Sequence, residues 1–423
     1  MCFPSLQNEK GDFKASLGDD TKGLLQLYEA SFLLTGSESS LELTREFTTN
    51  LLQEKLNNID NDNLSLLVHR ALELPRHCML LRANIRWFLD AYGRRPNMNP
   101  TLFELAKLDF NIFQANVQQE LKHISRWWKE TGFVEKLPFS RDRVVESYLW
   151  TTGIEPLEQG HERILATKII MLGIVLDDIF DVYATLEELQ LFCDVIQRWD
   201  LESIEKLRVY RQIFFVALNN NVNEIAYHIL KQQGVVSKKN VWIDLCEAFM
   251  KEAIWYNNGV QPSLEEYLNN AWISVAIPTF LYQVYFLVTN PREKEAIKYL
   301  DEYHNIIRWS TMITRLADDV ATAGDELERG DVSQSIQCYM NEIGASDQEA
   351  RKAMRLLIWE AWKNLNTDRI SSSCPFREIF IQNVVNLARV GQSMYQYGDG
   401  FGCQHSETKN KDRIMSMLFD PIA

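Results

Sequence analysis

Residues 21–34 read TKGLLQLYEASFLL, and their spacing is that of an α-helix. Leu24, Leu27, Tyr28, Ser31 and Phe32 recur at steps of three and four residues, which places them on one apolar stripe. The same period continues along most of the chain, whereas strict alternation of apolar and polar residues is almost absent. Only 18 glycines and 11 prolines occur in 423 residues, too few for the many turns of an all-β fold. The sequence therefore predicts an all-α protein.

Composition and charge set outer bounds on the function. Hydrophobic residues make up 46% of the chain, which is enough for a large core. The formal net charge of -14 argues against a general nucleic-acid binder, which needs an excess of Lys and Arg. Seven cysteines are scattered without a metal-binding spacing, so we expect buried free thiols. No uninterrupted apolar stretch reaches the roughly 20 residues of a membrane span, and we expect none.

Breaks in the helical pattern divide the chain. The strongest is YGRRPNMNP at residues 92–100, which carries two prolines, a glycine and two asparagines. We place a domain boundary there, with an N-terminal helical domain at residues 1–97 and a larger domain at residues 98–423. Further breaks between helices are expected at KLPFSRDR (136–143), KQQGVVSKKN (231–240), GVQPS (259–263) and SSSCPF (371–376).

Residues 172–183, LGIVLDDIFDVY, place three aspartates in an apolar run. On a helix Asp177 and Asp181 share one face, and Asp178 is turned about a third of a revolution away. Buried carboxylates are costly unless they are paired or bind a metal, and two unpaired ones repel each other. A divalent cation with oxygen ligands, Mg²⁺ or Mn²⁺, resolves the conflict. The alternative is a helix end that simply reaches solvent.

A second oxygen-bearing stripe lies in RLADDVATAGDELERGD at residues 315–331. Asp318, Thr322 and Glu326 are spaced four and four, so on a helix they line one face over two turns. Two carboxylates with a hydroxyl between them suit a hard cation. A solvated acidic face is the alternative for this stretch alone. Two such stripes in one chain favour a metal site.

Carboxylates with Mg²⁺ indicate an anionic substrate, usually a phosphate, whose remaining charge needs basic partners. Arg315 precedes Asp318 by three residues and lies nearly on its face. Arg141 and Arg143 lie on or near a helix start, where anions are favoured. The planar guanidinium of arginine suits phosphate oxygens, although surface exposure is the ordinary alternative for these two.

Taken together, these motifs resemble those of plant class I terpene synthases. DDIFD (177–181) is similar to the aspartate-rich motif of the family, DDVATAGDE (318–326) to its second metal motif, and RDR (141–143) to its diphosphate-sensing pair. The resemblance covers essentially the whole chain and includes SRWWKETGF (125–133) and RWD (198–200). NAWISV (270–275), YFLVTN (285–290) and TTGIEP (151–156) look like the angiosperm monoterpene branch, which implies geranyl diphosphate as substrate.

The resemblance implies a class I terpenoid synthase helical bundle preceded by part of an N-terminal α-helical (α-barrel) domain. It implies three Mg²⁺ or Mn²⁺ ions in the mouth of the bundle, two of them held by Asp177 and Asp181. The third would be held by Asp318, Thr322 and Glu326. Three arginines would grip the diphosphate, and Asp178 would lie behind the ligands. The arginines are Arg141, Arg143 and Arg315.

The chemistry implied is ionisation of an allylic diphosphate to a carbocation inside a dry apolar pocket. Aromatic faces stabilise such a cation without attacking it. Trp150 is similar to a pocket tryptophan of the family, and plain core packing is the alternative for any single aromatic. Weaker candidates are Tyr395, Tyr397, Phe401 and Trp272, with Asp399 as a polar link near Tyr395.

Several alternatives stay open at this level. The enzyme could prefer farnesyl diphosphate or accept both substrates to give linalool-type and nerolidol-type alcohols, or the chain could be a truncated, non-catalytic paralogue. The family has a longer N-terminal region, often with a plastid transit peptide, so a full-length form is expected in the plastid and this chain otherwise in the cytoplasm. We expect a monomer. The chain has no DxDD and no second DDxxD, which disfavours a protonation-initiated cyclase and a chain-elongating prenyltransferase.

Overall fold

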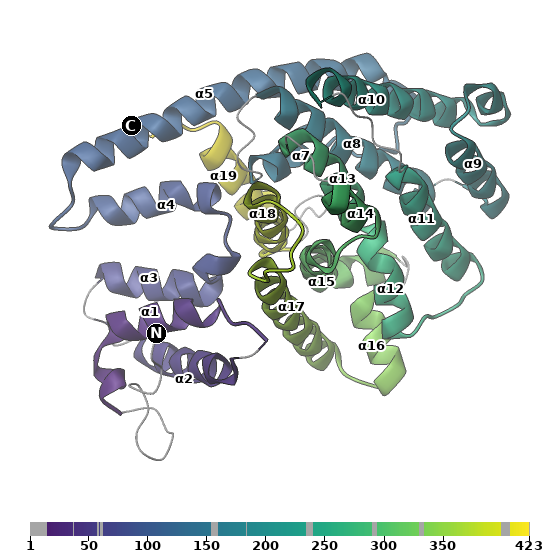
Figure 1. The fold of residues 1–423 in the computed structure, drawn as a ribbon. Helices are drawn as coiled ribbons and strands as arrows, with labels where there is room; N and C mark the ends of the chain where they lie inside the picture. The colour runs from purple at the N-terminus through teal and green to yellow at the C-terminus, as the bar shows by residue number, and fades with distance from the viewer. Residues whose placement is uncertain are drawn as a thin grey trace.

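The structure, a computed structural model, describes residues 15–36, 38–56, 59, 62–153, 160–182, 184–233, 240–289, 294–329, 334–398 and 407–422. Within these ranges every regular element is a helix and no strand occurs, which confirms the all-α prediction. Figure 1 shows a small group of N-terminal helices beside a larger bundle, with α13 and α15 near the centre of the bundle.

The N-terminal group has a core of its own. It consists of η2 (Ala15–Asp19), α1 (Thr21–Ser31), α2 (Ser39–Lys55) and α3 (Asp62–Glu73). Asp20 begins α1 by accepting a hydrogen bond from the backbone N–H of Gly23. The predicted stripe of α1 faces inward, because Leu24, Tyr28 and Phe32 are buried in this core. The indole of Trp359, from the larger bundle, packs against the same core and joins the two parts.

Two helices form a hairpin above the N-terminal group in Figure 1. They are α4 (Leu81–Gly93) and α5 (Pro100–Thr131), preceded by the short η4 (Arg76–Cys78). The predicted break at 92–100 separates them. Asn99 starts α5 because its side chain accepts hydrogen bonds from the backbone N–H groups of Thr101 and Leu102.

The larger bundle shares one continuous core that runs from Leu74 to Leu418. The predicted breaks at 136–143, 259–263 and 371–376 all fall between its helices, and most of 231–240 lies outside the described residues. Its elements are α6 (Phe133–Lys136), α7 (Val144–Thr152), α8 (Gly160–Val182), α9 (Leu186–Arg198), η5 (Leu201–Lys206), α10 (Val209–Gln233), α11 (Val241–Asn257), α12 (Leu264–Ser274), α13 (Ile277–Val288), α14 (Lys294–Asp301), α15 (Asn305–Arg329), α16 (Ser335–Ile343), α17 (Asp347–Arg369), α18 (Glu378–Met394) and α19 (Glu407–Leu418).

The junction of α12 and α13 is a sharp corner. Ala276 adopts a left-handed conformation with φ of 63°, and Pro278 follows in the first turn of α13. By length and composition the stretch Leu264–Val288 could cross a membrane, and within the described residues it alone meets that test. However, 72% of its most apolar window is buried inside the molecule. The corner turns this stretch into two core helices.

The cysteine prediction is met in part. The side chains of Cys78, Cys246 and Cys338 are buried, whereas those of Cys193 and Cys374 are half-buried. The remaining two cysteines lie outside the described residues.

Candidate active site

A cavity of about 520 Å³ lies inside the larger bundle, between α8, α11, α15 and the corner that joins α12 and α13. Apolar and aromatic residues make up more than half of its lining residues, and carboxylates and arginines lie among them. Asp177 of the first motif and Asp318 and Thr322 of the second all line this one cavity. The aromatic members of the wall include Trp150, Phe180, Trp242, Phe249, Phe280 and Tyr395.

On one side of the cavity, Arg141 is held by two neighbouring aspartates of α8. Its Nη2 donates to Asp177 Oδ2 at 2.6 Å and its Nε to Asp178 Oδ1 at 2.6 Å. Asp178, only 4% exposed, also accepts from the backbone N–H of Arg141 and from Ser140 Oγ. Burial opposes the charge of Arg141, but the two carboxylates outweigh it and raise its pKa. Arg141 is therefore fixed and charged at the cavity edge.

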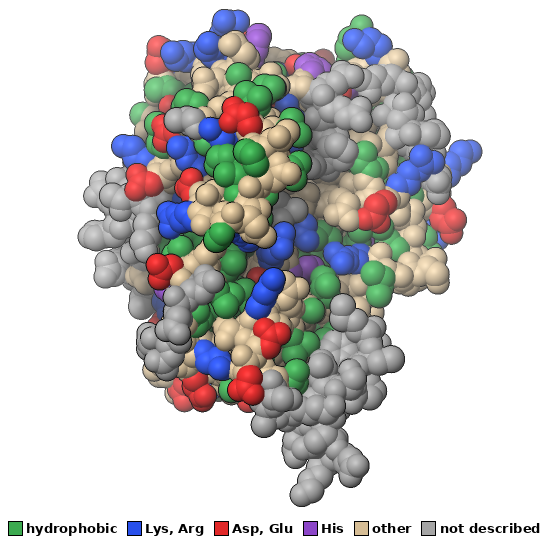
Figure 2. Space-filling model, turned by 90° about the vertical axis from the view of Figure 1, so that its left-hand side faces the viewer, with side chains coloured by type: hydrophobic (Ala, Val, Ile, Leu, Met, Phe, Trp, Pro, Cys, Tyr) green, Lys and Arg blue, Asp and Glu red, His purple; other side chains and the backbone are tan. Residues whose placement is uncertain are grey.

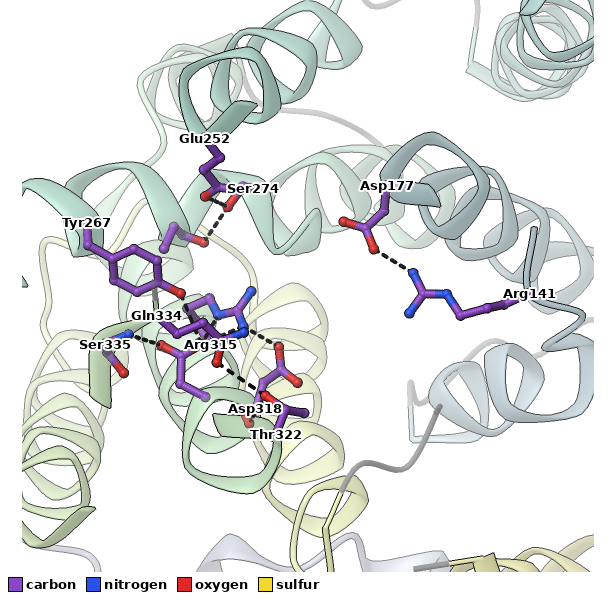
Figure 3. A network of polar contacts seen from close by, with 12 residues as sticks. Arg141, Asp177, Glu252, Tyr267, Ser274, Arg315, Asp318, Thr322, Gln334 and Ser335 are labelled. Carbon is purple, nitrogen blue, oxygen red and sulfur yellow. Dashed lines mark hydrogen bonds and ion pairs between the residues drawn. The ribbon is translucent and has the colours of Figure 1, made fainter. Parts of the chain in front are cut away.

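Facing this pair, Arg315 of α15 is held in the same manner (Figure 3). Its Nη2 lies 2.6 Å from Asp318 Oδ2 and 2.5 Å from Asp319 Oδ1. Asp319 is fully buried and also accepts hydrogen bonds from Tyr267 OH, at 3.1 Å, and from the backbone N–H of Ser335, at 3.3 Å. In each Asp-Asp pair, the first aspartate thus lines the cavity and the second lies behind an arginine.

The hydroxyl of Thr322 lies one turn after Asp318, as the helical spacing predicts. It donates to the backbone oxygen of Asp318 at 3.0 Å and lies 3.2 Å from Gln334 Oε1. Asp181 and Glu326, the last members of the two stripes, lie within α8 and α15, but their side chains are outside the described residues.

Arg143 is placed differently from Arg141. It is the N-cap residue of α7, and its Nη1 lies 3.4 Å from the backbone oxygen of Asp142. It is not among the residues that line the cavity. Its predicted contact with a diphosphate stays a prediction.

The aromatic candidates separate clearly. Trp150 and Tyr395 line the cavity and meet edge to face, with ring centroids 6.2 Å apart. Trp272 and Tyr397 do not line the cavity. Trp272 packs against Tyr303, and Tyr397 contacts Arg70. Phe401 and Asp399 lie outside the described residues.

Glu252 of α11 is a cavity residue that the sequence analysis missed. Its Oε1 accepts hydrogen bonds from Ser274 Oγ at 2.6 Å and from Asn270 Nδ2 at 3.0 Å. Burial raises the pKa of Glu252 to about 7, against those hydrogen bonds and the positive charge of Arg315. Its partners lie on α12, so no local sequence pattern pointed to it.

The donor set fits a hard divalent cation. Asp177 is 36% exposed at its side chain, so its carboxylate is open toward the cavity, and Asp318 and Thr322 face the same space. Carboxylate and hydroxyl oxygens are ligands that Mg²⁺ and Mn²⁺ prefer. Among the described residues, no group of three Asp, Glu, His or Cys side chains is arranged to hold a metal ion. One carboxylate of each stripe, Asp181 or Glu326, has a side chain outside the described residues.

Comparison with known proteins agrees with this geometry. Residues 129–364 match the metal-binding domain of the terpene synthase family, and residues 1–72 match the terpene synthase N-terminal domain. The chain therefore belongs to the terpene synthase family. It is 50% identical to a chloroplastic myrcene synthase of Quercus ilex over 99% of this chain, and it spans 70% of that relative's length.

Two solved structures share the fold along the whole chain. A limonene synthase with 2-fluorolinalyl diphosphate is 47% identical, with a TM-score of 0.94, and this chain covers 78% of it. An isoprene synthase from Populus x canescens with three Mg²⁺ ions and dimethylallyl-S-thiolodiphosphate is 37% identical, with a TM-score of 0.92, and this chain covers 80% of it.

Proposed function

We propose that this terpene synthase is a monoterpene synthase that uses divalent metal to ionise geranyl diphosphate, releasing diphosphate and a terpene product. One observation carries the proposal: two carboxylate–arginine clusters from separate segments meet at one cavity whose remaining wall is largely apolar and aromatic (Figure 3). The similarity to a myrcene synthase and a limonene synthase supports a ten-carbon substrate.

The polar part of the cavity would bind the diphosphate. Arg141 and Arg315 are each held in place by paired aspartates, so their guanidinium groups are positioned to stabilise the leaving group as the allylic C–O bond breaks. Asp177, Asp318 and Thr322 would hold Mg²⁺ or Mn²⁺, together with Asp181 and Glu326. When bound, these ions would supply most of the positive charge that neutralises the departing diphosphate.

The apolar part of the cavity would control what happens to the cation. Its wall would exclude water, which otherwise quenches the cation at once. The rings of Trp150 and Tyr395 can stabilise positive charge through their faces without forming a bond. Cyclisation, loss of a proton or capture of one admitted water would then set the product.

Further parts of the proposal rest on the family resemblance. Arg143 would reach the diphosphate, and the division into residues 1–97 and 98–423 would separate the N-terminal helices from the catalytic domain. We also propose a plastid location, because the myrcene synthase relative is chloroplastic.

Gas chromatography of products from purified protein with Mg²⁺ and geranyl diphosphate tests the substrate directly. A parallel reaction with farnesyl diphosphate distinguishes the fifteen-carbon alternative. The matched pair Asp177→Ala and Asp194→Ala controls for the loss of an acid, because Asp194 lies on α9 and does not line the cavity. We expect loss of turnover by orders of magnitude only in the first. Protein that binds Mg²⁺ and diphosphate but releases no volatile product would refute the proposal.

A further inference from the structure

Arg70 of α3 connects the N-terminal helices to the segment that follows α18. Its Nη1 lies 3.2 Å from Glu73 Oε2 and 3.3 Å from Tyr397 OH. Its Nη2 donates to Asn84 Oδ1 of α4 at 3.2 Å, and its guanidinium lies 5.9 Å from the ring centre of Trp87. One side chain thus links α3, α4 and a turn 327 residues away in sequence. Figure 2 shows several Lys and Arg side chains close together near the middle of the face drawn.

Tyr397 also contacts α19. The guanidinium of Arg413 lies 5.5 Å from the ring centre of Tyr397, and its Nη1 donates to the backbone oxygen of Ser393 at 2.7 Å. The hydroxyl of Tyr397 also lies 3.4 Å from Glu73 Oε2, so it can accept from Arg70 and donate to Glu73. The hydroxyl of Tyr397 is therefore clamped between Arg70 and Glu73, while its ring lies beside Arg413.

The clamped turn carries part of the cavity wall. Tyr395 precedes Tyr397 by two residues, lines the cavity and meets Trp150 edge to face. The position of Trp150 is tied to the same region through Gly153, just after α7. A Cβ there would lie 2.1 Å from Val390 Cγ2 and 2.8 Å from Leu80 Cδ1. The Trp150–Tyr395 contact is thus set by packing among α7, α18 and the N-terminal segment.

We propose that Arg70, acting through Tyr397, is a positioning residue that fixes the cavity wall at Tyr395 and so governs the product ratio. This inference rests on the proposed function. Arg70 does not line the cavity, so its removal leaves the carboxylates and arginines at the diphosphate in place. A loosened wall admits water and new substrate conformations after ionisation, so side products increase while ionisation continues.

The test compares Arg70→Met, Tyr397→Phe and the double variant with the parent, using Mg²⁺ and geranyl diphosphate. We expect the ratio of side products to main product to rise about fivefold in each, the effect of one net hydrogen bond on an equilibrium. Water-derived alcohols should lead this rise, and kcat should change much less. The double variant should resemble the stronger single one, because both remove the same contact. Arg70→Lys, which keeps the charge without the planar group, should restore part of the ratio.

Arg95→Met is the matched control, because Arg95 stacks on Phe88 and Tyr92 without touching the turn. An unchanged product ratio in both Arg70→Met and Tyr397→Phe would overturn the inference, as would an equal shift in the control. Tyr397→Phe removes a single hydroxyl and keeps the test valid if Arg70→Met does not fold. If the unsubstituted protein makes no terpene, the proposed function is wrong. If it is active but the variants give the same product ratio, only this inference is wrong.

Discussion

The substitution Asp319→Asn tests whether the second aspartate of the DD pair is a structural anchor rather than a metal ligand. Asp319 is fully buried and accepts hydrogen bonds from several donors. These are Arg315 Nε at 2.6 Å and Nη2 at 2.5 Å, Tyr267 OH at 3.1 Å and the backbone N–H of Ser335 at 3.3 Å. A carboxylate accepts from all of them, whereas the NH₂ group of asparagine must oppose at least one.

The expected cost follows from this geometry. Breaking a buried ion pair by removing one charge destabilises a protein by about 3–5 kcal/mol. Arg315 keeps a second partner, since its Nη2 lies 2.6 Å from Asp318 Oδ2. We therefore expect the lower end, a loss of about 3 kcal/mol in the free energy of unfolding.

Urea unfolding followed by circular dichroism, in EDTA, measures this loss. The control is Asp318→Asn, whose side chain is 16% exposed and lines the cavity. It should lose about 1 kcal/mol or less, because Arg315 stays paired with Asp319, yet it should lose most of its turnover. If Asp319→Asn unfolds within 1 kcal/mol of the parent, the reasoning about this buried charge is wrong.

Three further predictions concern packing and pH. Gly153→Ala should destabilise the protein by about 1–3 kcal/mol, because its Cβ would overlap Val390, whereas Gly324→Ala, with open space around it, should not; thermal unfolding measures both. Burial and the nearby Arg389 and Arg369 lower the pKa of His77 to about 3. The stability that the neutral imidazole contributes is therefore complete above pH 6.5, the ordinary pKa of histidine, and is lost as the pH falls from 6.5 toward 3. Urea unfolding at pH 7.5 and at pH 5 measures this effect. On going from pH 7.5 to pH 5, the free energy of unfolding should fall less in His77→Asn than in the parent. Because burial raises the pKa of Glu252 from 4.5 to about 7, the metal-free protein should lose stability as pH rises across that window; the same titration of Glu252→Gln should lack this component, and an identical slope would contradict it.

The sequence predicted the local features of the site well, because helical spacing is a local property. Helical spacing turned Asp178 away from the face of Asp177, and in the structure Asp177 lines the cavity while Asp178 lies behind Arg141. The same rule applied to the second DD pair would have indicated Asp319, since it sits one position beyond Asp318 just as Asp178 follows Asp177.

Features that depend on distant segments were not accessible in this way. Glu252 gains its place from Ser274 and Asn270 on a neighbouring helix, and a single glutamate in α11 has no periodic signal. For the same reason Trp272 was a weaker candidate beside Trp150, and of the two only Trp150 lines the cavity. Which face of a helix meets the cavity is decided by packing between helices, and one sequence does not encode that locally.

Helix α8 carries two kinds of cavity residue. Ile169, Ile170, Gly173 and Ile174 form part of the hydrocarbon wall, while Asp177 sits one turn further along the same rigid rod. A substitution that tilts or shifts α8 therefore displaces the apolar lining residues and Asp177 together. Changes aimed at a different product should therefore be tolerated better at lining positions on α13 or α18, because neither helix carries a carboxylate that lines the cavity.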